Sequence, residues 1–189
     1  MAIASCDLIL SPPIDGWLSQ AGSSPATAFL LSPELTKSVL REKLTPENWT
    51  LPRWLAERAR GGVNRLSALL RLPLGPLRRI RQRVWQGARS CNLAIWRVDL
   101  DRVDGFDADY SGWGKEDSDI IVRLLHAGIR RKDGVFATGV LHLWHAEADR
   151  SHLSENEHKL GVVVAGGRVR AQRGLSSLQD ASATVMAVS

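Results

Sequence analysis

The chain has 189 residues, of which 44% are hydrophobic and 24% are charged, and its formal net charge is +5. This length supports one domain, or one domain and part of another, and the composition excludes disorder of the whole chain. The two cysteines, Cys6 and Cys91, exclude a disulfide framework and a CxxC zinc site. The sequence has no basic leader and no unbroken apolar stretch of about 18 residues, so we expect a cytoplasmic protein without a membrane span.

Composition predicts four segments along the chain. Residues 1–30 are rich in small residues, Pro and Gly, which predicts an irregular start. Residues 31–90 form an Arg-rich segment with short helices. Residues 91–160 mix strand and helix patterns, and residues 161–189 are rich in Gly, Ser and Ala, which predicts a flexible tail.

Hydrophobic periodicity and turn residues predict several short elements in these segments. Helices are expected at 35–44, 97–105, 116–128 and 151–160, and strands at 91–96 and on both sides of residue 134. Ser32 is a suitable N-cap for the first helix, with Pro33 at its first position. The Asp133–Gly134 dipeptide between two apolar runs predicts a β-hairpin.

The most basic part of the sequence is the window 53–89, which contains ten Arg and a single acid, Glu57. The window has net charge +9, which leaves −4 for the rest of a chain whose total is +5. Arg interleaved with Leu suits an anionic partner such as lipid head groups, a phosphorylated glycan or nucleic acid. The alternative is a solvated Arg-rich face. Nucleic acid is the least favoured partner, because no nucleic-acid-binding module accompanies the window.

Three carboxylates open the helix predicted at 116–128. Asp117 lies four residues before Ile121 and is therefore expected on the buried stripe of this helix. Asp119 precedes Arg123 by four residues, which predicts an ordinary surface ion pair. A carboxylate at the inward mouth of a helix can serve as a general base in a polar cleft. Alternatively, the acids only complement the helix dipole.

Two further features of the sequence are a Trp just before these acids and a pair of His residues well after them. Trp113 lies between two glycines, where it could be a core residue or an exposed platform for a sugar ring. His142 and His145 are three residues apart at the end of a predicted strand and could help to bind a divalent metal. Residues three apart on a strand face opposite sides, so we expect at most one of them to bind the same ion.

The segment from Cys91 to Arg150 resembles a known family through a combination of short motifs: GFD, GWG, an ED pair, Arg-Leu, a glycine and a final His. It is similar to the C-terminal half of a family 2 glycosyltransferase of the GT-A type, in particular to the galactosyltransferase C-terminal module. Residues 29–89 are similar more loosely. The resemblance implies an α/β fold, a partial GT-A domain comprising the acceptor-side half with short mixed strands and helices.

The resemblance also implies roles on the acceptor side. Asp117 matches the general base of an inverting transfer, and Glu116 matches a residue that binds the acceptor sugar. Trp113 and Gly114 match the acceptor-side loop. Lys115 departs from the family, which often has a second glycine there.

On the donor side, the resemblance places Asn92 against the donor sugar. His142 matches the family's metal ligand, with His145 as the competing alignment, for a Mn²⁺ or Mg²⁺ ion that holds the nucleotide diphosphate. The implied partners are a nucleotide-sugar donor and a glycan or glycolipid acceptor, in envelope polysaccharide or lipopolysaccharide assembly.

The N-terminal, nucleotide-binding half of a GT-A enzyme is not recognisable before Cys91, and the DxD strings of this sequence (99–101, 107–109 and 117–119) all lie after it. Only about 90 residues precede Cys91, and they contain neither a βαβ nucleotide-binding pattern nor a DxD motif. We therefore expect a truncated or divergent copy of the domain, cytoplasmic and in peripheral contact with the inner face of an anionic membrane. The alternative is a non-catalytic remnant that binds acceptor sugar or the membrane surface.

Overall fold

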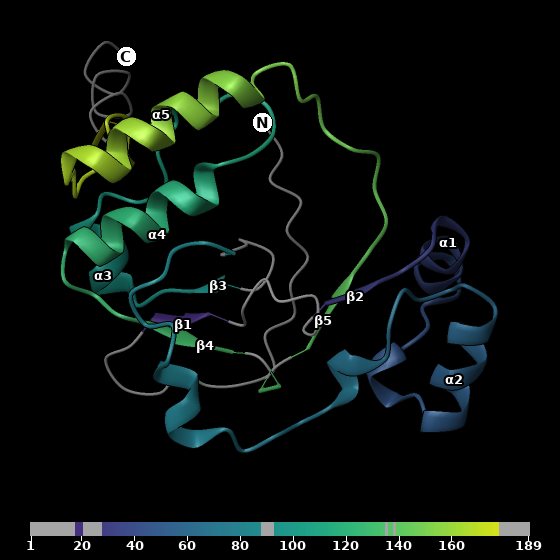
Figure 1. The fold of residues 1–189 in the computed structure, drawn as a ribbon. Helices are drawn as coiled ribbons and strands as arrows, with labels where there is room; N and C mark the ends of the chain where they lie inside the picture. Colours follow the sequence, from purple (N-terminus) through teal and green to yellow (C-terminus); the bar gives the residue numbers. More distant parts are fainter. Residues whose placement is uncertain (1–17, 21–27, 88–92, 135, 138, 178–189) are drawn as a thin grey trace, which may run out of the picture.

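The computed structural model of the chain has a mixed α/β architecture, which confirms the fold class (Figure 1). It describes residues 18–20, 28–87, 93–134, 136, 137 and 139–177. The strands are β1 (Leu18–Gln20), β2 (Ala28–Leu30), β3 (Leu93–Ala94), β4 (Arg131–Asp133) and β5 (Val140–His142). The α-helices are α1 (Pro33–Glu42), α2 (Leu51–Ala59), α3 (Arg97–Arg102), α4 (Glu116–His126) and α5 (Leu153–Gly166). Three short 3₁₀ helices are η1 (Pro46–Asn48), η2 (Ser67–Leu69) and η3 (Gly75–Arg79).

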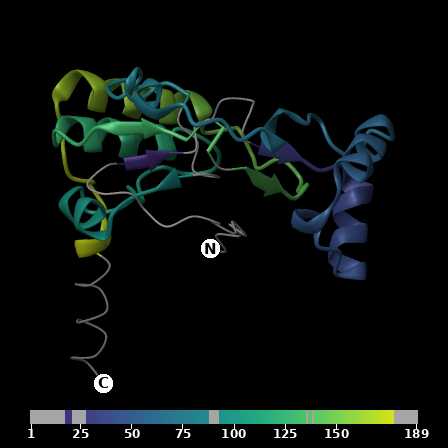
Figure 2. The ribbon, with the colours of Figure 1, turned by 90° about the horizontal axis from the view of Figure 1, so that it is seen from below.

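The strands form two small sheets. In the first sheet the order is β3-β1-β4, with β1 antiparallel to β3 and parallel to β4. In the second sheet β2 pairs in parallel with β5, and Phe29 lies opposite Leu141. Helices α3, α4 and α5 gather around the first sheet, while α1 and α2 lie at the far end of the molecule beyond the second (Figures 1 and 2).

The hairpin predicted around Asp133–Gly134 is wrong. β4 and β5 belong to different sheets, and each pairs in parallel with a strand from the N-terminal part of the chain. An Asp-Gly turn indicates pairing between sequence neighbours, but it says nothing about distant strands that compete for the same edges. Here β1 and β2 take those edges.

The far end of the molecule has its own small core. As predicted, Ser32 caps α1: its Oγ accepts a hydrogen bond from the Leu35 amide at 3.1 Å. Leu35 packs with Phe29 and Trp54, whose rings stack with centroids 4.7 Å apart. This core fixes β2, and through it the parallel partner β5.

The second core surrounds α4. Ile120, Ile121 and Leu124 are fully buried and pack with Val103. On another face of α4, the buried Val122 packs with residues of α5, which lies alongside it (Figure 1). A helix that is apolar on several faces is a central helix, so α4 holds the segments before and after it in place.

Helix α5 is longer than the sequence predicts. It was expected to end at Leu160, but it continues to Gly166 and is followed by Gly167 at φ +69. Val163 is 3% exposed in the α4–α5 core, so packing extends the helix beyond its polar first half. None of the helices in the described ranges combines the length and the hydrophobicity needed to span a bilayer.

Candidate functional site

The loop that leads into α4 has an unusual backbone. Gly112, Gly114 and Lys115 have φ values of +68°, +100° and +79°. A Cβ atom added to Gly112 would also lie 3.2 Å from the carbonyl oxygen of Asp149. Left-handed backbone and close approach both favour glycine, which accounts for the two glycines around Trp113. Lys115 adopts the same region where the family that the sequence resembles often has glycine.

Trp113 is held at the surface of this loop. Its backbone N–H donates to the Asp149 carbonyl at 3.1 Å, and the residue is 36% exposed. The Arg150 guanidinium lies 4.5 Å from the ring centroid, which is a cation–π contact. Trp113 is therefore a surface residue rather than a core residue, and Arg150 covers part of its ring.

Glu116 and Asp117 begin α4, and both are half-buried. Glu116 Oε2 is buried and has no hydrogen-bond partner in the described part of the chain. Burial raises the pKa of Glu116 and the charge of Asp117 adds to this effect, against an opposing contribution from backbone N–H groups. Asp117 Oδ1 accepts a hydrogen bond from the Ser118 hydroxyl at 3.3 Å. The structure thus brings two carboxylates together, and one of them holds an acceptor atom that no described residue satisfies.

Asp119, and not Asp117 as predicted, is the buried carboxylate of α4. Asp119 and Arg123 do form the predicted pair, at 2.7 Å, but both side chains are fully buried instead of lying on the surface. The Arg123 guanidinium also donates to the carbonyls of Val103 and Gly105, at 2.6 and 2.9 Å. Because α4 is packed on several faces, its polar pair is enclosed by the segment after α3, whereas Asp117 stays only half-buried.

A network of acids that local sequence patterns do not reveal ties the chain after α5 to the segment before α4. Asp107 accepts hydrogen bonds from the backbone amides of Gln172 and Arg173, at 2.8 and 3.2 Å, and from Arg168 at 3.1 Å. Asp104 similarly accepts from the Ser176 amide at 2.8 Å. The motif GFD contains Asp107, but nothing in the sequence names its partners, which lie some 60 residues further on.

His142 and His145 do not face opposite sides as predicted. Their ring centroids lie 5.2 Å apart in an edge-to-face arrangement. The reason is that β5 ends at His142, so the alternation of a strand no longer applies to His145. His145 Nδ1 lies 2.9 Å from the Ala146 carbonyl, which can only accept, so this nitrogen carries the proton.

The chemistry of these donors limits the kind of metal site that they can make. Within the described ranges, no group of three or more His, Cys, Asp or Glu side chains is arranged to hold a metal ion. Mn²⁺ and Mg²⁺ prefer oxygen ligands, and Mg²⁺ is commonly held by one or two carboxylates together with phosphate oxygens. Two imidazoles by themselves therefore do not fit a resident Mn²⁺ or Mg²⁺ ion, and one of them could only supplement the phosphate oxygens around an ion carried by a diphosphate.

The predicted residues thus fall into two groups joined by one connection. Trp113, Gly114, Glu116 and Asp117 lie together at the start of α4, while the histidines lie at the end of β5. Residues 143–152 run from β5 to α5 and dock on Trp113 through Asp149 (Figure 1). Asn92, the predicted donor-side residue, lies outside the described residues.

A family comparison covers both groups. Residues 80–146 match the family model described as the N-terminal domain of galactosyltransferase. No solved structure matches the chain. The match contains the entry to α4 and both histidines, and it supports a glycosyltransferase-type domain with a nucleotide-sugar donor and an acceptor as partners. The matched family model is described as an N-terminal domain, whereas the sequence motifs resemble the C-terminal module of galactosyltransferases. The family match and the motif resemblance therefore agree on a general glycosyltransferase function.

Proposed function

We propose that this chain is an inverting glycosyltransferase of family 2 and the GT-A type. It transfers a hexose from a nucleotide-sugar donor to a hydroxyl of a glycan or glycolipid acceptor in polysaccharide assembly. The observation that carries the proposal is the family match over residues 80–146, which contains adjacent carboxylates beside an exposed Trp at the start of α4.

In this proposal Asp117 is the general base. The acceptor oxygen attacks the anomeric carbon, a new C–O bond forms, and the bond to the nucleotide diphosphate breaks with its electron pair. The acceptor proton moves to the Asp117 carboxylate. The N-terminal dipole of α4 and the Ser118 hydroxyl both interact favourably with a carboxylate at this position.

Glu116 binds the acceptor, with Trp113 and Gly114 as its neighbours. Glu116 Oε2 is buried and has no partner among the described residues, so an acceptor hydroxyl could donate to it once a shift of the loop 112–115 uncovers this oxygen. The raised pKa of Glu116 also makes it the competing candidate for the base, because a base is most effective when its pKa is near the working pH.

On the donor side, His142 is the proposed ligand of a Mn²⁺ or Mg²⁺ ion that accompanies the diphosphate, and His145 is the alternative. Such an ion, when bound, neutralises charge on the leaving diphosphate. The adjacent His145 ring would then limit how the His142 ring can turn. Asn92 is retained as a proposed donor-side residue from the sequence resemblance.

A second candidate function is favoured by an exposed surface in the Arg-rich window. Leu70, Leu72, Leu77 and Ile80 are between 42% and 74% exposed. They alternate with Arg residues, and no acid occurs between residues 70 and 83. A protein could use this surface to hold an anionic membrane, and Trp113 to hold a glycan, without transferring a sugar.

The experiment that separates the two functions is release of nucleotide diphosphate by the purified chain from a panel of nucleotide sugars, with and without glycan acceptors. Acceptor-dependent release supports transfer. Asp117→Asn should then reduce kcat at least tenfold, about 1.4 kcal/mol, whereas Glu116→Gln should mainly raise the acceptor KM. Glu155→Gln is the matched control, because Glu155 is also in the first turn of a helix but is exposed.

Three other outcomes are informative. If Glu116→Gln takes the kcat loss and Asp117→Asn does not, the base is Glu116. If Asp117→Asn keeps more than about a tenth of kcat, a base role for Asp117 is excluded. If no donor is consumed while glycan or vesicle binding persists, the chain is a binding protein.

A further inference from the structure

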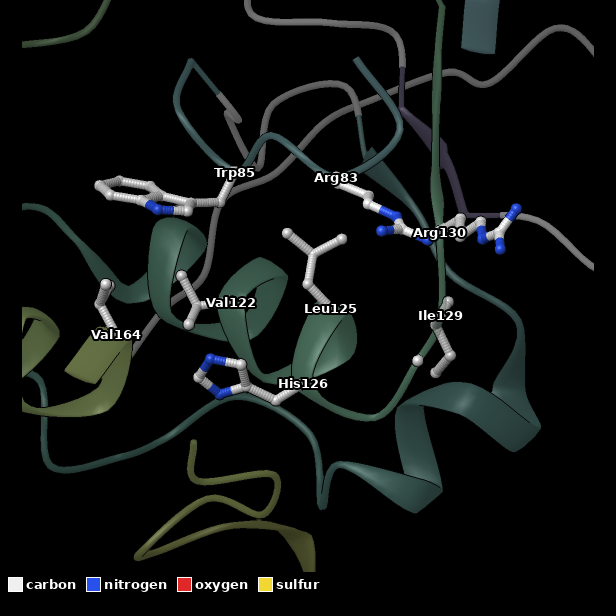
Figure 3. Close-up of a pocket in the computed structure, with 9 residues that line it drawn as sticks. Arg83, Trp85, Val122, Leu125, His126, Ile129, Arg130 and Val164 are labelled. Atoms are coloured by element: carbon white, nitrogen blue, oxygen red, sulfur yellow. The ribbon is translucent and has the colours of Figure 1, made fainter. Parts of the chain in front are cut away.

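A cavity of about 490 Å³ lies beside the C-terminal half of α4 (Figure 3). Residues of α4 and α5 and the segment after η3 line it. On α4 the lining begins at Val122, which is five residues, or about 8 Å along the helix, beyond Asp117, and none of the proposed transfer residues lines the cavity. The cavity is therefore distinct from the proposed transfer site.

The lining is apolar on one side and cationic on the other. Trp85 and Val164 lie on one side, Arg83 and Arg130 on the other, and Leu125 is between them (Figure 3). His126 adds an imidazole to the lining, and none of the lining residues is acidic. Neither Arg83 nor Arg130 forms an ion pair with a residue in the described part of the chain.

The aromatic wall of the cavity is held firmly in place. Arg131, which is 1% exposed, donates from Nη1 to the carbonyls of Val84 and Gln86, at 2.9 and 3.2 Å. These carbonyls belong to the residues immediately before and after Trp85. The Arg131 amide also donates to the Gln82 carbonyl at 2.9 Å. A buried side chain thus fixes the backbone that carries Trp85, and a wall fixed before binding loses little freedom when a ligand arrives.

His126 is fixed as well. Its Nδ1 lies 2.9 Å from the Arg168 carbonyl and must carry the proton, because the carbonyl only accepts. The ring therefore presents Nε2 as its second polar atom. Arg83 and Arg130 are both exposed, and their guanidinium groups lie at the rim of the cavity, on the far side of Leu125 from Trp85 (Figure 3). An ordered apolar wall with polar groups beside it is a common setting for a small-molecule site.

We propose that this cavity binds a small amphiphilic anion, with an aromatic or aliphatic body against Trp85 and a phosphate, sulfonate or carboxylate group at Arg83 and Arg130. Guanidinium groups suit such oxyanions because their donors match two oxygens at once. The neighbouring C-terminal end of α4 favours cations without any ligand. The helix dipole explains why Arg side chains are favourable here, but it does not explain why an open cavity with a fixed indole wall lies beside Arg83 and Arg130.

Two fluorescent probes that share an anilinonaphthalene body test the proposal. One is 8-anilinonaphthalene-1-sulfonate, and the other is N-phenyl-1-naphthylamine, which lacks the sulfonate. We expect saturable binding of the sulfonate to the full chain, weakened at least tenfold in the double variant Arg83→Gln/Arg130→Gln. Affinity for the neutral probe should change less than twofold. Arg58→Gln/Arg102→Gln removes the same charge from exposed positions outside the cavity and is the matched control.

A second pair of variants tests the location. Val164 lines the cavity and is 41% exposed, so Val164→Phe should fill the space and weaken both probes. Val162→Phe, on the same helix but outside the lining, should leave both unchanged. The proposal is overturned if the sulfonate shows no saturable binding, if the Arg83 and Arg130 changes act no more than their control, or if the two Phe variants behave alike.

Discussion

Glu116 pairs two properties that are unfavourable for folding. Its Oε2 is buried without a partner among the described residues, and it stands next to another carboxylate. Burial first, and then the charge of Asp117, raises its pKa above the ordinary value of 4.5. Natural chains retain such groups most often at functional sites, where stability is exchanged for reactivity or binding.

This leads to a prediction on stability that is independent of any substrate. Below about pH 4.5, the ordinary value for Glu116, both the folded and the unfolded chains are protonated there and no electrostatic penalty exists. As the pH rises, the unfolded chain ionises first and the folded state becomes relatively less stable. Glu116→Gln should therefore be more stable than the wild type at pH 7, with the difference shrinking as the pH falls to about 4.

Urea unfolding of both proteins at several pH values measures this difference. The matched control is again Glu155→Gln, whose exposed carboxylate bonds to Lys159 and has a lowered pKa, so the sign of its pH dependence is reversed. A Glu116→Gln variant that is less stable at pH 7 would show that a partner satisfies Glu116 in solution.

At the scale of elements, α4 is organised by its buried ion pair. Asp119 and Arg123 lie one turn apart, and Arg123 reaches the carbonyls after α3. Tyr110 donates to Asp119 Oδ1 at 3.3 Å, which adds the loop before α4 to the same network. A buried pair contributes little net stability by itself, but losing one partner leaves an uncompensated charge in the core.

We predict that Asp119→Asn lowers the free energy of unfolding by about 3–5 kcal/mol. The chain contains a close control: Arg97 and Asp101 form an i,i+4 pair at 2.8 Å on the surface of α3. Asp101→Asn should cost less than about 1 kcal/mol, because exposed pairs are screened by water. Equal losses in the two variants, measured by thermal or urea unfolding, would contradict the burial of the α4 pair.

The end of β5 gives a prediction on metal dependence that rests on the proposed function. If His142 is the ligand, His142→Ala should raise the Mn²⁺ concentration needed for half-maximal transfer at least tenfold. His145→Ala should have a smaller effect, because it removes only the ring that packs against His142. A Mn²⁺ titration of both variants measures this, and the reverse order would assign the ligand to His145.

Local signals explain which elements the sequence predicts well. The Ser32 cap and the apolar stripe of α4 act within a few residues, so Ser32 caps α1 and α4 begins at Glu116 as expected, although α1 spans Pro33–Glu42 instead of 35–44. β4 pairs with β1, β5 pairs with β2, and Asp119 is buried by segments that are distant in the sequence. Local patterns do not carry that information. For the same reason the carboxylates of the candidate site are visible in the sequence, but the unsatisfied oxygen of Glu116 is not.

At the scale of the molecule, two cores lie at opposite ends and the Arg-rich window runs between them. One core contains Trp54 and the other contains Ile120, and Trp85 packs against the second. Between them, η3 and its flanks expose Leu77 at 60% and Ile80 at 74%. Exposed apolar side chains bordered by cations are typical of surfaces that dock on anionic membranes.

We therefore predict salt-sensitive binding of the chain to anionic vesicles. Each basic residue near such a surface contributes about 1 kcal/mol, so three or four engaged Arg side chains give a measurable affinity. Co-sedimentation with phosphatidylserine vesicles should decline between about 0.05 and 0.5 M salt, and phosphatidylcholine vesicles should bind weakly throughout. Leu77→Ser/Ile80→Ser should reduce binding to the anionic vesicles, since both side chains would enter the interface. Leu40→Ser, at a 61% exposed position on α1, is the control and should not. Equal binding to both vesicle types, or no response to salt, would leave the window as a solvated face.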